Sequence, residues 1–249
     1  MPTRTQSHRH IGEIINELPW QSLLIFSIAQ NIIWWSFPIH YGRITGAAFH
    51  GNQLLLLAYT IVMSLTTFLM FQANFKSLWA HVPILISLLL AFSGIIRGNL
   101  EILIMLLMFS AFWLVVEMRW LNLQNIWGLI IYALLSTFPI SSAIFFFQNR
   151  FLSTTFLINL IPLFMCQLFF MMPIFESAGK RRTIAMGITG VMLIGAILFF
   201  HFSLLGVLAS AVVILTFWFN INYANLKGQY TAAAYILLEL ITYIILIFA

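Results

Sequence analysis

The residues best suited to chemistry are the six acidic ones, and all of them are glutamates. Carboxylate clusters rich in aspartate are a common means of holding Mg²⁺ against a diphosphate, because hard cations prefer oxygen ligands. The lack of aspartate disfavours that chemistry here. The chain also has no G-x-S-x-G, H-E-x-x-H or nucleotide-loop motif. We therefore assign no catalytic residue, no metal ligand and no cofactor from the sequence.

Glu239 is the strongest candidate for a functional residue, because it falls near the middle of the last apolar segment. Ionisable groups at membrane depth are costly and often mark ion or proton pathways. Two interpretations stay open. Glu239 either relays protons or holds a cation, or it is protonated and hydrogen-bonded to a neighbouring helix.

Four amide side chains also lie within apolar segments. Gln30 and Asn31 belong to the first segment, and Asn159 and Gln167 belong to the sixth. Amides at depth often join helices by hydrogen bonds, and they can equally line a cavity. Two prolines in the sixth segment favour a kink, which would open a pocket between helices. We therefore treat these four amides as candidate ligand-binding residues.

The composition sets the class of protein that must position these side chains. Apolar residues make up 62% of the chain, charged residues only 7%, and the mean hydropathy is +1.03. A soluble domain has about 25% charged residues, so lipid is expected to cover this chain and to be its first partner. The net charge of +5 is scattered, which suits an anionic membrane surface better than nucleic acid. We expect an integral membrane protein, placed in the cytoplasmic membrane.

The apolar segments predict an all-α helical bundle with about nine transmembrane helices. A span needs about 20 apolar residues, and spans are expected at 20–39, 53–72, 78–96, 100–117, 126–147, 153–175, 183–200, 203–221 and 230–248. The third and fourth spans nearly merge, as do the seventh and eighth, so seven or eight spans are alternatives. The chain is therefore expected to have two regions, a cytoplasmic segment at 1–19 and a transmembrane domain at 20–249. The first region is either an amphipathic helix on the membrane surface or a helical extension of the first span.

The basic residues predict that the N-terminus lies inside. Under that orientation the inner segments carry eight of them: Arg4, Arg9, Lys76, Arg119, Lys180, Arg181, Arg182 and Lys227. The outer segments carry three: Arg43, Arg97 and Arg150. This asymmetry follows the positive-inside rule. Trp34 and Trp35 fall near an outer end of the first span, where an aromatic belt is expected.

One basic inner loop resembles a known family. The run Glu176-Ser-Ala-Gly-Lys180-Arg181-Arg-Thr183-Ile-Ala-Met-Gly187 is similar to the second motif of the UbiA superfamily of membrane prenyltransferases. In that motif an aspartate-rich stretch leads into glycine, a basic residue, threonine and a small apolar run. The resemblance implies nine helices with an inside N-terminus, and a site formed by the loops at 73–77 and 176–182. Glu176, Lys180 and Arg181 are therefore candidate ligand-binding residues.

The chain departs from that family at the metal-binding acids. Aligned on Thr183, the family's last two aspartates fall on Glu176 and Met172. The first motif corresponds to Gln72-Ala-Asn74-Phe75-Lys76-Ser77, which contains no acid. The family's aspartates hold the Mg²⁺ that neutralises a prenyl diphosphate, and one glutamate does not replace them. The resemblance therefore implies a fold that has lost this catalysis.

Three functions remain as hypotheses. The first is a non-catalytic, UbiA-like membrane protein that binds a hydrophobic molecule (an isoprenoid, quinone, pigment or lipid) or serves as a subunit of a membrane complex. The second is a transporter or permease subunit that uses Glu239 and the kinked sixth span. The third is a lipid-modifying membrane enzyme, which the missing aspartates disfavour.

Overall fold

The computed structural model describes residues 19–44, 53–93, 96, 98–222 and 230–249. Within these ranges all regular secondary structure is helical. The helices are α2 (Trp20–Ile44), α3 (Gln53–Gln72), η1 (Leu78–Ala80), α4 (His81–Ala91), α6 (Leu100–Val115), η2 (Arg119–Leu121), α7 (Ile126–Asn149), α8 (Thr154–Asn159), α9 (Ile161–Phe175), α10 (Lys180–Phe200), α11 (Leu204–Asn222) and α12 (Thr231–Ile247). The amphipathic segment predicted at 1–19 lies outside the described residues except for Pro19.

Each of the nine predicted spans contains a helical stretch, and this part of the sequence prediction is confirmed. Six stretches are long and apolar enough to cross a membrane, while Leu78–Ala91, Leu100–Val115 and Thr231–Ile247 are shorter apolar helices. The predicted division of the two nearly merged pairs also holds, since α4 is separate from α6 and α10 is separate from α11. The chain is thus an all-helical protein with the features of an integral membrane protein.

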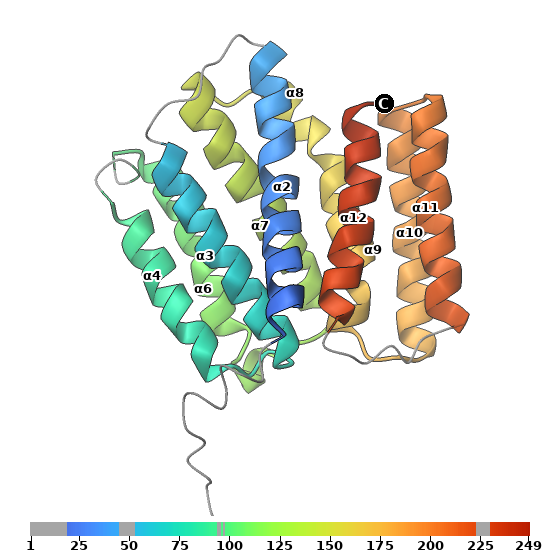
Figure 1. Ribbon diagram of the computed structural model, residues 1–249, viewed down its shortest axis with the longest axis horizontal. Coiled ribbons are helices and arrows are strands. Elements are labelled where there is room, and N and C mark those ends of the chain that lie inside the picture. The colour runs from blue at the N-terminus through green and yellow to red at the C-terminus, as the bar shows by residue number, and fades with distance from the viewer. Residues whose placement is uncertain (1–18, 45–52, 94–95, 97, 223–229) are drawn as a thin grey trace, which may run out of the picture.

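Successive helical stretches run alternately in opposite directions and form one bundle (Figure 1). α2 packs against α3, α7 and α12, and α9 packs against α7, α10 and α12. These four helices, α2, α7, α9 and α12, therefore surround the centre. The α10–α11 hairpin lies at one edge (Figure 1), and its apolar side chains are largely exposed, as expected for a surface that faces lipid.

The sixth span is divided by a break rather than crossed by one continuous helix. α8 ends at Asn159, and α9 begins at Ile161 with Pro162 in its first turn. Proline suits that position because the first turn of a helix leaves its backbone N–H groups unpaired. The break lies at the end of the bundle farthest from the start of α2 (Figure 1).

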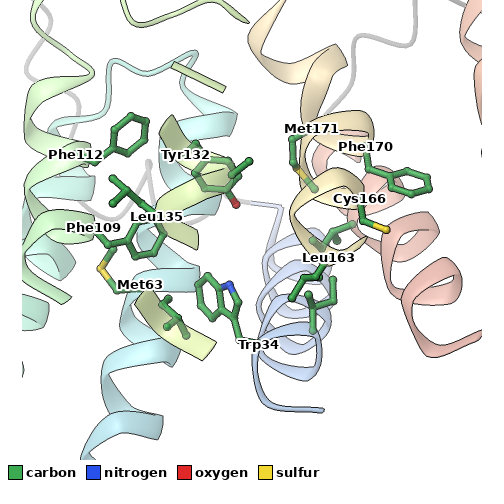
Figure 2. Packing of buried hydrophobic residues seen from close by; sticks show 14 of the residues in the cluster. Trp34, Met63, Phe109, Phe112, Tyr132, Leu135, Leu163, Cys166, Phe170 and Met171 are labelled. Atoms are coloured by element: carbon green, nitrogen blue, oxygen red, sulfur yellow. The ribbon is translucent and has the colours of Figure 1, made fainter. Parts of the chain in front are cut away.

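The core is rich in aromatic side chains. Two of them, Trp34 and Trp35, show that one prediction was wrong. Trp34 and Trp35 are buried rather than placed in an interfacial belt. The Trp34 indole donates to Ser136 Oγ of α7, and the Trp35 indole donates to Thr60 Oγ1 of α3, each at 3.0 Å. Hydrophobicity places both rings in the core, and their N–H groups find partners there. Figure 2 shows Trp34 among the buried residues of this core.

Candidate functional site

A cavity of about 710 Å³ opens at the end of the bundle where α3 and α9 end and where α10 and α12 begin. Its walls come from those helix ends and from the loops at 73–77, 116–125 and 176–179. Helix ends supply unpaired backbone groups, and loops supply side chains free of helical packing. The volume is within the range of small-molecule sites.

The deeper wall of the cavity is aromatic. The rings of Phe75 and Phe175 lie 4.8 Å apart between centroids, and the rings of Phe71 and Phe175 lie 5.6 Å apart. Tyr132 of α7 packs on both Phe71 and Phe175, at 5.5 and 5.6 Å. Such edge and tilted contacts form a rigid apolar surface. This wall suits the hydrocarbon part of a ligand.

The outer wall is polar and carries mostly amides. Gln72, Asn74, Asn122, Gln124 and Asn125 all line the cavity. Asn125 fixes the local loop: its Oδ1 accepts from the Trp127 N–H at 2.8 Å, and its Nδ2 donates to the Asn122 carbonyl at 2.7 Å. The first of these bonds is an N-cap of α7. The other four amides are positioned by that loop and by the end of α3.

The charged side chains of the cavity wall give it a net positive charge. Glu176 lies 3.9 Å from the Arg181 guanidinium, and Arg182 is buried at the start of α10. The described wall thus contains one carboxylate and two guanidinium groups. A second cavity, of about 180 Å³, is lined by Lys76 and shares Asn122 with the first. The balance of charge favours an anionic or hydrogen-bond-accepting group.

The backbone of the cavity is held in a sparsely populated conformation at three positions. Asn74, Phe75 and Asn122 have φ angles of 49°, 60° and 46°, and they are three of the four non-glycine residues with positive φ in the described ranges. The Phe75 N–H donates to the Met70 carbonyl at 2.7 Å, which ends α3 tightly. Left-handed residues that are not glycine cluster at functional sites.

The structure places only some of the predicted site residues at this cavity. Glu176 and Arg181 line the cavity, whereas Lys180 is exposed and does not line it. Asn159 ends α8 at the opposite end of the bundle (Figure 1). Asn31 joins helices instead: its Nδ2 donates to Ser64 Oγ of α3 at 3.0 Å. Two of these five residues therefore belong to the cavity.

The remaining three candidates lie within the bundle. Gln30, Gln167 and Glu239 are buried, and none of their side-chain oxygens or nitrogens has a hydrogen-bond partner among the described residues. They come from α2, α9 and α12. These three residues form a second set, deeper than the cavity.

Arg182 and the amides of the 116–125 loop are functional candidates that sequence reasoning did not select. A usable signal existed for Arg182, since Arg182, Met186 and Gly190 recur every four residues and all are buried on α10. An arginine at the head of a buried stripe points into the protein. The loop amides offered no such signal, because a loop has no periodicity.

Comparisons with protein-family models, with curated proteins and with solved structures find no significant match to this chain. The residues themselves therefore carry the functional argument. Among the described residues, no three histidine, cysteine or acidic side chains come together to hold a metal ion. The cavity offers instead one carboxylate, two guanidinium groups, amides and an aromatic wall. These groups are suited to binding an amphiphile.

Proposed function

We propose that this protein is a non-catalytic, UbiA-like membrane bundle that binds the polar headgroup of a hydrophobic molecule in the 710 Å³ cavity. The main support for the proposal is that residues of two loops line the same cavity. The resemblance assigns the family's site to the loops at 73–77 and 176–182, and Asn74, Phe75, Glu176 and Ser177 from those loops line one cavity.

The chemistry of the wall favours a phosphate-bearing isoprenoid or lipid over a quinone or pigment. Arg181 and Arg182 supply positive charge, and the amides supply N–H donors for phosphate oxygens. Phe71, Phe75 and Phe175 supply an apolar surface for the adjoining hydrocarbon. A neutral ring would make less use of the net positive charge of this wall, which has two guanidinium groups and one carboxylate.

Under this proposal the cavity faces the cytoplasm. Nine crossings with an inside N-terminus put Lys76, Lys180, Arg181 and Arg182 on the inner side, as the positive-inside rule requires. The alternating helices of Figure 1 support an odd number of crossings, because α2 begins and α12 ends at opposite ends of the bundle. A ligand would then enter from the inner leaflet.

The residues of the site argue against Mg²⁺-dependent prenyl transfer. Among the described residues of the cavity wall, Glu176 is the only one with a carboxylate, and Arg181 lies beside it. Bridging metal ions to a diphosphate takes several carboxylates. An assay with prenyl diphosphates and Mg²⁺ separates the two functions. Turnover that is lost in Glu176→Gln would establish the enzyme.

Native mass spectrometry of the protein, extracted in mild detergent from the membrane in which it was made, tests the proposal. We expect a bound species that contains phosphorus, and about tenfold less of it in Arg181→Gln because one charge-assisted hydrogen bond is lost. Arg150→Gln is the matched control, since Arg150 ends α7 at the opposite end of the bundle. Equal retention in both variants, or no bound species in the wild type, contradicts the proposal.

A further inference from the structure

Glu239 is a buried carboxylate whose charge nothing in the described structure neutralises. It has no exposed surface, and both carboxylate oxygens lack a hydrogen-bond partner among the described residues. Its electrostatic neighbours are Tyr132 of α7, Cys166 of α9 and Tyr243 of its own helix. None of these is a base that could pair with it. A buried carboxylate without a partner requires a proton or another cation.

Gln167 of α9 is a second buried polar residue near the centre of the bundle. Cys166, one residue earlier, lies near Glu239, and the ring of Phe164 lies 5.9 Å from Phe138 of α7. Cys166 thus marks the side of α9 that faces α12, and Phe164 marks the side that faces α7. Successive residues of a helix are about 100° apart around its axis, so Gln167 lies between these two sides. Its side chain therefore projects between α12 and α7, toward the centre of the bundle. There it is buried, and its amide has no partner among the described residues.

Gln30 approaches the same centre from α2. The bond between Trp34 and Ser136 fixes the register of α2 and α7, which run in the same direction. Gln30 is one turn before Trp34, and Tyr132 is one turn before Ser136, so the two lie level. Figure 2 shows the Tyr132 hydroxyl on the side of its ring that is nearer to α9.

We propose that Glu239, Gln30 and Gln167 form an exchangeable binding site for a monovalent cation, either Na⁺ or a proton, at the centre of the bundle. The carboxylate supplies the charge, and the two amide oxygens supply neutral ligands of the kind that hard cations prefer. Three unpartnered polar side chains from three helices, all buried, fit a small occupant that completes their bonding. This site is separate from the cavity ligand and does not depend on its identity.

Tyr132 connects this site with the aromatic wall of the cavity. Its ring contacts Phe71 and Phe175 of that wall, and it is also an electrostatic neighbour of Glu239. In the described part of the chain, two of the other helices against α12 place no competing ionisable group there. α11 has none, and Tyr59 of α3 donates instead to the Leu106 carbonyl at 2.7 Å. A cation that reaches Glu239 from the inner side would pass Tyr132.

Thermal unfolding of the purified protein at constant ionic strength tests for Na⁺. If Na⁺ is the occupant, replacing choline with Na⁺ raises the Tm by about 5 °C at a concentration 100-fold above the Kd. Li⁺ acts similarly and K⁺ acts less. The Tm of Glu239→Gln stays constant across these salts, because glutamine keeps the shape but not the charge. Glu101→Gln, which changes an exposed glutamate of α6, keeps the wild-type response.

Infrared difference spectra between pH 5 and 9 test for the proton. If the occupant is a proton, a protonated-carboxyl band disappears as the pH rises, and it is absent from Glu239→Gln at every pH. The wild-type spectra alone are informative should that variant fail to fold. A wild type that responds neither to Na⁺ nor to pH in the carboxyl region overturns the proposal, because its site is then not exchangeable.

Discussion

At the scale of residues, the cavity is defined by side chains whose backbone is held away from its preferred conformation. Phe75 has a φ of 60°, which is unusual for a bulky residue, and its ring packs against Phe175. Such left-handed residues cost about 1–3 kcal/mol each and persist when the surroundings fix them. Asparagine tolerates this region better than phenylalanine. The strain at Phe75 therefore has to be offset by the packing of the aromatic wall.

Asn74→Gly separates backbone strain from ligand binding. Glycine accepts the φ of 49° at Asn74 without strain, so we expect a free energy of unfolding within about 1 kcal/mol of the wild type. The amide that lines the cavity is lost, and we expect several-fold weaker retention of the bound molecule. Thermal unfolding and native mass spectrometry measure the two effects. A variant that unfolds earlier but retains its ligand would show that Asn74 only ends α3.

His201 gives the expected pH dependence outside the helices. It lies in the turn between α10 and α11, and partial burial lowers its pKa below the ordinary 6.5. The unfolded chain therefore binds the proton first, so the contribution of His201 to stability is complete above about pH 6.5 and is lost as the pH falls below it. We expect the Tm to drop over that range, and to drop less in His201→Asn. An unchanged slope in the variant would rule out this cause.

Residue types alone selected part of both proposed sites. Glu239 stood out because a carboxylate inside an apolar segment is costly, and Glu176 and Arg181 stood out because their loop resembles a family motif. Gln30 and Gln167 were selected as amides at depth, but so were Asn31 and Asn159, which lie elsewhere. Which face of a helix an amide occupies depends on its neighbours. A nearly all-apolar helix gives no polar face from which to read that orientation.

At the scale of elements, the cavity depends on how the 116–125 loop is pressed against α7. Gly128, in the first turn of α7, lies so close to the Leu123 carbonyl that a Cβ there would collide with it. That close approach holds Asn122 and Gln124 in the cavity wall. A glycine is required at this position because the backbone of the loop comes close to the backbone of α7, and not because the chain must be flexible there.

Gly128→Ala should therefore displace the loop while leaving the helices formed. We expect circular dichroism to show unchanged helix content and native mass spectrometry to show loss of the bound molecule. Gly195→Ala on α10 is the matched control, because no described atom beyond its own stretch of helix lies within 4 Å of the added Cβ. Ligand retention in both variants would mean that the loop does not form the binding wall.

The positions of the helices along the sequence were predicted better than the structure at the helix ends. Each of the nine predicted apolar runs contains helix in the described residues, as expected where a chain in lipid must pair its backbone within each helix. The break between α8 and α9 was expected only as a kink. The burial of Trp34 and Trp35 was missed, since two tryptophans near a span end look alike whether they face an interface or partner hydroxyls. Those hydroxyls belong to other helices, and a single sequence does not pair helices.

At the scale of the whole molecule, the proposed function requires the cavity end of the bundle to face the cytoplasm. Cysteine labelling in intact cells of the expression host tests this. The native Cys166 is buried and gives little background. We expect a membrane-impermeant maleimide to label Phe202→Cys, at the exposed turn after α10, without permeabilisation. Ser177→Cys, at the cavity, should react only after permeabilisation. The reverse pattern would invert the topology.

The central claim is that the cavity holds the headgroup of an amphiphile. It is tested most directly by a cryo-EM map of the natively purified protein in lipid nanodiscs, enlarged with a bound antibody fragment. We expect density in the cavity, with a headgroup beside Arg181 and Arg182 and a hydrocarbon chain along Phe71 and Phe175. A cavity that holds only solvent, with amphiphile density elsewhere on the bundle or none at all, would contradict it.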